Sequence, residues 1–171
     1  MVLHATLLAH VGRTADAEAV WRQVIGREVW MRTFSRQALV TNLAGRGEPA
    51  LAAPILSELK PGAIVEIGSD WGANTRLLLE FCTTHGSVLH VVDPLPKLDP
   101  ESLKAEYRDH FRLYRTLSLN GLSRVEHSDV VLVDGDHNWY TVYHELQLIE
   151  KLCRDRRSGF PLVLLHDVGW P

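Results

Sequence analysis

The sequence predicts an α/β fold: a Rossmann-like, doubly wound and mostly parallel sheet that follows an N-terminal helical segment. From residue 63 onwards, short apolar runs alternate with amphipathic stretches of helical period. The apolar runs are rich in β-branched residues, and each ends in glycine or polar residues. Strands that alternate with helices form βαβ units, and right-handed crossovers then place helices on both faces of the sheet.

Five strands are expected, at residues 63–68, 87–93, 111–118, 129–136 and 161–167. The first of them, AIVEIG, is a short apolar run with β-branched residues, which is typical of a strand that is buried on both faces. Helices are expected over residues 74–86, 101–111 and 138–155, with a short connection over 119–127. The last helix carries Val142, Leu146, Ile149 and Cys153 along one stripe, which predicts its buried side.

Two regions are expected along the chain: an N-terminal helical cap over residues 1–54 and the main domain over residues 55–171. In the cap, Thr14 can start a helix, and Gly45 and Gly47 can stop another. The sequence ends just after the fifth predicted strand, so we expect a domain truncated there, with its C-terminal strands missing. An open sheet edge would result, which a homo-oligomer or further residues would cover.

Composition excludes several classes of protein. With 18 basic and 21 acidic residues among 171, the formal net charge is −3, which argues against a nucleic-acid partner held by phosphate contacts. No apolar run approaches the roughly 20 residues that span a bilayer, so no membrane partner is expected. The two cysteines are far apart in sequence and are typical of free thiols in a reducing compartment. A cytoplasmic protein is therefore expected.

The strand ends carry the residues of chemical interest, because ligands bind at the carboxyl ends of parallel strands. Gly68 and Gly72 allow a tight turn after the first strand, but Asp70 and Trp71 between them suit a pyrophosphate poorly. Asp93 ends the second strand, 25 residues after Gly68, where a carboxylate can accept both hydroxyls of a ribose. A ribose without a pyrophosphate indicates S-adenosylmethionine as the cofactor.

Three stretches resemble a known family. VEIGSDWGANTRLLLEF (65–81) and LHVVDPLP (89–96) resemble the first two motifs of the class I S-adenosylmethionine-dependent methyltransferases. VDGDHNWYTVYHELQLIEKL (133–152), followed by LVLLHDV (162–168), resembles a small-molecule O-methyltransferase subgroup, similar to macrocin O-methyltransferase and the cephalosporin hydroxylase-like proteins. The resemblance implies that residues 55–171 form an S-adenosylmethionine-binding domain, in a fold that has seven strands in the family.

The resemblance also implies roles for single residues. Cofactor-binding positions would be Glu66, Gly68, Ser69, Gly72, Asp93, Ser118 and Asp134. Asp93 would hold the ribose, Ser118 would lie near the adenine edge, and Asp134 would face the sulfonium. In metal-dependent relatives, carboxylates equivalent to Asp134 and Asp167 bind a divalent cation, which makes Mg²⁺ a second candidate cofactor, although Val168 stands where the usual third ligand would be.

The expected reaction is methyl transfer to a hydroxyl of a small molecule, such as a natural-product sugar. His137 is the first candidate for the catalytic base, and His166 is the second. A metal-dependent hydrolase that uses Asp136, His137, His166 and Asp167 is the alternative, beside a nicotinamide oxidoreductase and a non-catalytic nucleotide-binding remnant. We expect the 171 residues by themselves to bind the cofactor without detectable turnover.

Overall fold

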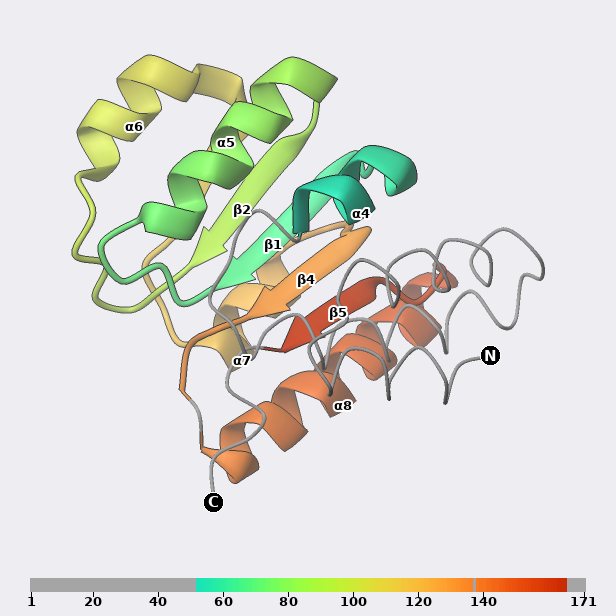
Figure 1. The fold of residues 1–171 in the computed structure, drawn as a ribbon. Coiled ribbons are helices and arrows are strands. Elements are labelled where there is room, and N and C mark those ends of the chain that lie inside the picture. Colours follow the sequence, from blue (N-terminus) through green and yellow to red (C-terminus); the bar gives the residue numbers. More distant parts are fainter. Residues whose placement is uncertain (1–51, 137, 166–171) are drawn as a thin grey trace, which may run out of the picture.

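A computed structural model describes residues 52–136 and 138–165 of the chain (Figure 1). These residues form a five-stranded parallel sheet with the strand order β3-β2-β1-β4-β5. The expected α/β Rossmann-like fold is therefore confirmed for this part of the chain. The expected cap over residues 1–54 lies almost entirely outside the described residues, and its boundary with the main domain stays a prediction.

The strands and helices alternate along the chain as expected. The strands are β1 (Ala63–Ile67), β2 (Val88–Val92), β3 (Phe111–Tyr114), β4 (Val130–Val133) and β5 (Leu162–Leu165). The longer helices are α4 (Ala52–Leu59), α5 (Ala73–His85), α6 (Pro100–Tyr107) and α8 (Trp139–Arg156). Shorter turns of helix are η3 (Arg108–His110), α7 (Ser118–Gly121) and η4 (Leu122–Arg124).

All five strands end at the same level of the sheet. Ile67 in β1 is paired with both Val92 in β2 and Val133 in β4. Val92 is paired with Tyr114 at the end of β3, and Val133 with Leu165 at the end of β5. The residues that follow these strands therefore emerge along one edge, called here the carboxyl edge.

Two apolar layers cover the sheet. On one face, α4, α5 and α6 supply buried side chains that include Leu56, Leu79 and Leu103, which pack against Ile64 and Leu89. On the other face, α8 and the segment of α7 and η4 supply Ile149 and Leu122, which belong to the cluster of Val65 and the other inward residues of the sheet. Figure 1 shows α5 and α6 on one side of the strands and α8 on the other. The packing in each layer holds the helices in place relative to the carboxyl edge.

The helix ends have local causes in the sequence. α5 begins after Gly72 (φ 82°) and ends at Gly86 (φ 71°), whose N–H donates to the carbonyl of Cys82. Both glycines adopt the left-handed conformation, which costs them little because they have no Cβ. Asp99 caps α6 by accepting from the N–H groups of Glu101 and Ser102, and Asn138 caps α8 by accepting from that of Tyr140.

The third strand is shorter than the sequence predicted. We expected it to extend over residues 111–118, but β3 ends at Tyr114. The Thr116 N–H donates to the Tyr114 carbonyl (2.9 Å), and this turn removes the following residues from the sheet. Ser118 consequently begins α7 and does not end a strand. Among the described residues, no helix has the length and apolar character needed to cross a bilayer.

Candidate functional site

Gly68 is the point where three strand ends meet at the carboxyl edge. Its N–H donates to the Val92 carbonyl (3.0 Å), while the Asp134 N–H donates to the Ile67 carbonyl (2.8 Å). Gly68 has φ 82°, and a Cβ at this position would overlap the backbone carbonyl of Asp134. The sequence therefore needs glycine here for two reasons: the left-handed backbone and the close approach of β4.

The Asp93 carboxylate fixes the loop after β1 to the end of β2. Its Oδ2 accepts from both the N–H and the hydroxyl of Ser69, each at 2.8 Å. Its Oδ1 accepts from the N–H of Leu95, also at 2.8 Å. A carboxylate offers about four acceptor positions, and the described residues fill three of them, which leaves one on Oδ1. Both Asp93 and Ser69 are buried, which makes this arrangement rigid.

A second pair of contacts joins the same two loops. The Lys97 N–H donates to the Asp70 carbonyl (2.9 Å), and the Lys97 ammonium pairs with the Asp70 carboxylate at 2.5 Å. The ammonium also lies 5.4 Å from the centre of the Trp71 ring, within the range of a cation–π contact. Trp71, which is 72% exposed, is thus held at the surface of this loop.

Glu66 is a fully buried carboxyl group beside the site. It lies at the end of β1, 1% exposed, and its Oε2 accepts from the Thr75 hydroxyl on α5 at 2.7 Å. Burial raises the pKa of Glu66 to about 8; the Thr75 hydroxyl opposes the shift, and the charges of Asp134 and Asp93 add to it. Glu66 is therefore largely neutral at pH 7, and its pKa responds to both neighbouring carboxylates.

Asp134 and Asp136 follow β4. The Asn74 amide lies 3.4 Å from Asp134 Oδ2, which joins the first turn of α5 to the end of β4. Asp136 is exposed, and its two oxygens accept from the N–H of Asn138 (3.1 Å) and the hydroxyl of Thr141 (2.9 Å). Asp136 thus supports the start of α8.

The structure brings most of the predicted cofactor-binding residues together, while their roles with a ligand stay predictions. Glu66, Gly68, Ser69, Asp93 and Asp134 surround the ends of β1, β2 and β4. Gly72 starts α5, where a Cβ would press on Leu98 at 3.0 Å. Ser118 is half-buried at the start of α7, next to the first turns of α8. His137, His166 and Asp167 lie outside the described residues.

Two polar residues of this region were not predicted from the sequence. Thr75 stands on the buried stripe of α5 with Leu78, Leu79 and Cys82. Glu145 stands on the buried stripe of α8, 1% exposed, and among the described residues neither of its oxygens has a hydrogen-bond partner. Burial raises the pKa of Glu145, while the nearby Ser118 hydroxyl lowers it and the charge of Asp136 raises it. A polar residue at an otherwise apolar stripe position is the signal that would have found both.

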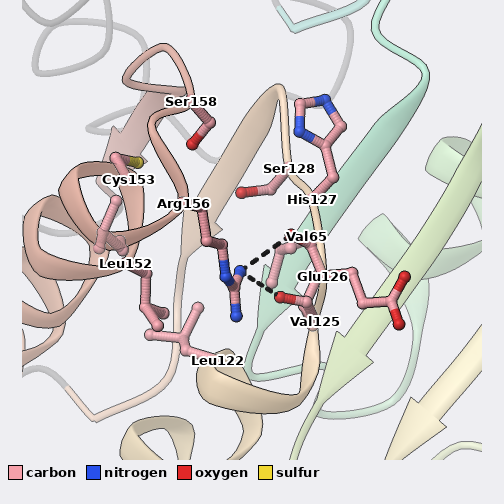
Figure 2. A pocket seen from close by; sticks show the side chains of 11 residues that line it. Val65, Leu122, Val125, Glu126, His127, Ser128, Leu152, Cys153, Arg156 and Ser158 are labelled. Atoms are coloured by element: carbon pink, nitrogen blue, oxygen red, sulfur yellow. Dashed lines mark hydrogen bonds between the residues drawn. The ribbon is translucent and has the colours of Figure 1, made fainter.

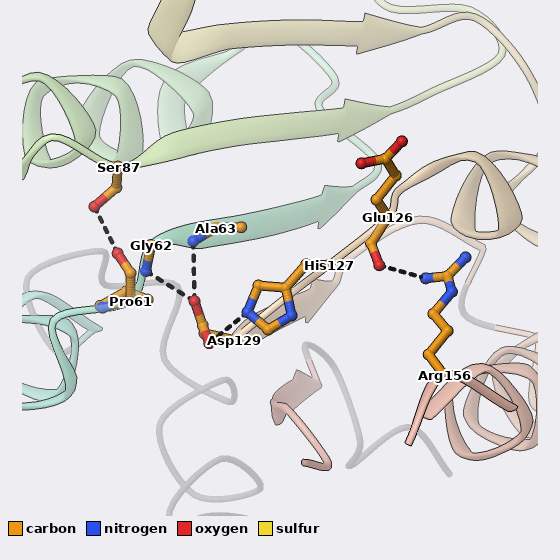
Figure 3. A network of polar contacts seen from close by, with 8 residues as sticks. All are labelled: Pro61, Gly62, Ala63, Ser87, Glu126, His127, Asp129 and Arg156. Carbon is orange, nitrogen blue, oxygen red and sulfur yellow. Dashed lines mark hydrogen bonds and ion pairs between the residues drawn. The ribbon is translucent and has the colours of Figure 1, made fainter. Parts of the chain in front are cut away.

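The opposite edge of the sheet has its own polar network. Asp129 Oδ2 accepts from the N–H groups of Gly62 (2.8 Å) and Ala63 (3.0 Å), and Oδ1 lies 2.9 Å from His127 (Figure 3). Arg156 on α8 donates to the carbonyls of Val125 and Glu126. A small pocket under the end of α8 lies beside this arginine and includes none of the predicted site residues (Figure 2).

The carboxyl edge is thus the described region that gathers the predicted cofactor-binding residues. Within residues 52–136 and 138–165, no three side chains of the types that ligate metals come together as a metal site. What the edge offers is a glycine backbone turn, acidic groups on both sides of it, and one open acceptor position on Asp93. This set fits a ligand that carries hydroxyl donors and a positive charge.

Comparisons with known proteins bear on this site. The chain matches a family model described as a methyltransferase domain over residues 65–168, more than half of its length. No curated protein matches the chain. A crystal structure of 1,6-didemethyltoxoflavin-N1-methyltransferase from Burkholderia thailandensis, with bound 1,6-didemethyltoxoflavin and S-adenosylhomocysteine, is similar at a TM-score of 0.47 and 16% identity. The similarity covers 81% of this chain, and the chain spans 55% of the length of that protein. On the family match, which runs through β1 to β5, the chain belongs to the methyltransferase-domain family.

Proposed function

We propose that the chain is the cofactor-binding part of an S-adenosylmethionine-dependent methyltransferase that acts on a hydroxyl of a small molecule, with natural-product sugars among the candidate acceptors. The carboxylates of Asp93 and Asp134 and the carboxyl of Glu66 around the Gly68 turn are the observation that carries this proposal. The membership in the methyltransferase-domain family supports it independently.

In this proposal, each part of the cofactor is assigned to a group of described residues. The open position on Asp93 Oδ1 would accept from a ribose hydroxyl, while Ser69 keeps the carboxylate oriented. Glu66 and Asp134 would face the positively charged methionine end, and Ser118 would lie near the adenine. When bound, the cofactor would supply a methyl group on a sulfonium: the acceptor oxygen would bond to the methyl carbon in line with the carbon–sulfur bond, and that bond would break to leave the neutral thioether.

The protein's task in such a reaction is mainly to align the acceptor oxygen, the methyl carbon and the sulfur, and positioning of this kind can supply several kcal/mol. A hydroxyl acceptor also loses a proton. His137 is the proposed base and His166 the second candidate, since a histidine within hydrogen-bonding reach can take that proton near neutral pH.

Metal assistance is a separate part of the proposal. Asp134 with Asp167 would be the ligands of Mg²⁺; Asp167 lies outside the described residues, and within these residues no metal site is assembled. The alternative of a metal-dependent hydrolase is not favoured, because Asp136, one of its four proposed ligands, holds the first turn of α8 with both oxygens. The cytoplasmic location and the homo-oligomer stay predictions from the sequence.

The test is calorimetric titration of the full chain with S-adenosylhomocysteine, with and without Mg²⁺. The variant Asp93→Asn places an amide where Oδ2 or Oδ1 now accepts N–H groups, and it should weaken binding at least tenfold. Asp129→Asn is the matched control, since Asp129 accepts two backbone N–H groups beside β1 at the opposite edge of the sheet. Both variants should lose about 1–3 kcal/mol of stability, but Asp129→Asn should keep the affinity within twofold.

The two variants separate the proposal from a general loss of structure. Equal affinities for the two variants, or absence of binding to the unmodified chain, would contradict the placement of the cofactor at the carboxyl edge. Binding of NADH in place of S-adenosylhomocysteine would favour the oxidoreductase alternative instead.

A further inference from the structure

Among the residues that the structure describes, the most exposed large apolar side chains lie on segments that follow the strands at the carboxyl edge. Among the described residues, five such side chains are more than 60% exposed: Trp71, Leu95, Leu117, Trp139 and Tyr140. Trp71 follows β1, Leu95 follows β2, and Leu117 follows β3. Trp139 and Tyr140 begin α8, just after β4. We call these five residues the apolar rim.

Exposed apolar residues that were scattered over the surface at random would not all follow strands at one edge of the sheet. Single exposed hydrophobic residues are normal on any protein, but a group along one edge marks a binding surface. Each of the strands β1 to β4 contributes at least one member, and their ends are in register. By contrast, Leu77, an exposed leucine on α5, is 46% exposed and does not belong to a loop at this edge.

Two members of the apolar rim are held by neighbours. Trp139 is stacked on Tyr143 with ring centres 5.4 Å apart and planes 8° from parallel. Trp71 lies under the ammonium of Lys97, which the Asp70 carboxylate anchors. Flat faces that are held in this way can receive another ring with little loss of side-chain freedom.

The charge at this edge is negative. The residues that follow the strand ends include the carboxylates of Asp70, Asp93, Asp134 and Asp136, against the cations of Lys97 and Arg115. The single net positive charge of S-adenosylmethionine would offset part of this excess. An acceptor that carries a phosphate or carboxylate would still meet repulsion.

We propose that the apolar rim binds the methyl acceptor, and that this acceptor is an uncharged molecule with a flat, apolar ring system that bears the hydroxyl. This inference rests on the proposed methyltransferase function and narrows its substrate class. The face of the acceptor ring lies against Trp139, and its hydroxyl points toward the cofactor at the ends of β1 and β4.

The test uses two probes that share one ring system and differ in charge: 2-naphthol, which is neutral at pH 7, and 6-hydroxy-2-naphthoate, which is an anion. Their affinities for the full chain are measured by saturation-transfer NMR in the presence of S-adenosylhomocysteine. We expect 2-naphthol to bind and 6-hydroxy-2-naphthoate to bind about fivefold more weakly, as one charge several ångströms from the acidic groups implies. Methyl β-glucoside, which is uncharged but polar, should bind more weakly than 2-naphthol.

Two variants locate the bound probe. Trp139→Ala should lower the affinity for 2-naphthol about three- to tenfold, which is the range expected for the loss of one aromatic stacking contact. Leu77→Ala, which removes an exposed apolar side chain of α5 that is not part of the apolar rim, should leave this affinity unchanged. The affinity of the same proteins for S-adenosylhomocysteine is measured separately. If S-adenosylhomocysteine does not bind, the proposed function fails, whatever the result with the two probes.

Several results would overturn the inference. The first is that 2-naphthol does not bind. The second is that the anionic probe or the glucoside binds as tightly as 2-naphthol or more tightly. The third is that Trp139→Ala and Leu77→Ala change the affinity for 2-naphthol equally. Sedimentation velocity supplies one more: a dimer that Trp139→Ala converts to a monomer would assign the apolar rim to contact between two copies of the chain.

Discussion

The buried carboxyl of Glu66 should make the stability of the protein depend on pH in an unusual direction. The substitution Glu66→Gln replaces the carboxyl with a neutral group of the same shape, and its amide oxygen can still accept from the Thr75 hydroxyl. The variant therefore removes one titration while it keeps the volume and the hydrogen bond. Its comparison with the unmodified chain isolates the contribution of this single group.

The magnitude follows from the two pKa values of Glu66. The pKa is about 8 in the folded chain, against 4.5 for an ordinary glutamate. Below pH 4.5 both states are protonated, and above pH 8 both are ionised, so the contribution is constant in those ranges. Between them the folded state holds the proton and the unfolded state does not, so stability falls by about 1.4 kcal/mol for each pH unit of increase. From pH 5.5 to pH 7.5 the loss is about 3 kcal/mol.

The assay is equilibrium unfolding in urea at pH 5.5, 6.5 and 7.5. All other titrating groups are the same in the two proteins, so the difference between their free energies of unfolding should change by about 3 kcal/mol from pH 5.5 to pH 7.5. With an m value of about 2 kcal/mol/M, the difference between their midpoints should change by about 1.5 M. The same pH dependence in both proteins would show that Glu66 is ionised in the folded chain and would refute the reasoning.

Two further predictions test the surroundings of the same edge. Gly68→Ala should prevent folding or lower the free energy of unfolding by several kcal/mol, because its Cβ would overlap the Asp134 carbonyl. Gly86→Ala has a similar φ but open space around its Cβ, so its loss of stability in thermal unfolding should be about 1–2 kcal/mol. Similar losses for the two variants would argue against the close contact at Gly68. Thr75→Val should raise the pKa of Glu66 further, by about one unit, because it removes the hydrogen bond that favours the carboxylate. NMR titration of the Glu66 carboxyl carbon checks this, and an unchanged pKa would mean that Thr75 does not interact with the ionised form.

The strands and the long helix were predictable because burial leaves a direct trace in the residue pattern. β4 and, apart from Glu66, β1 are runs of apolar, mostly β-branched residues, and the stripe of Val142, Leu146 and Ile149 defines α8. The end of β3 was predicted wrongly, because a turn closed by backbone groups leaves no such trace in the sequence.

The candidate site was predictable in its residue types but not in its internal contacts. The strand ends indicated Glu66, Gly68, Asp93 and Asp134, and the structure brings them to one edge. The sequence did not predict that Asp93 accepts from Ser69, because that bond joins residues 24 positions apart through a backbone N–H available in any sequence.

The bonds from Asp93 to Ser69 and from Lys97 to Asp70 also determine how a ligand would be received. Ordering the backbone of one flexible residue costs about 1–2 kcal/mol in conformational entropy. The loop after β1 is already held at two of its residues, so its ordering belongs to the folding of the chain and not to the arrival of a ligand. A small molecule that docks there meets a preorganised surface, and its contacts contribute to affinity without first being offset by closure of the loop.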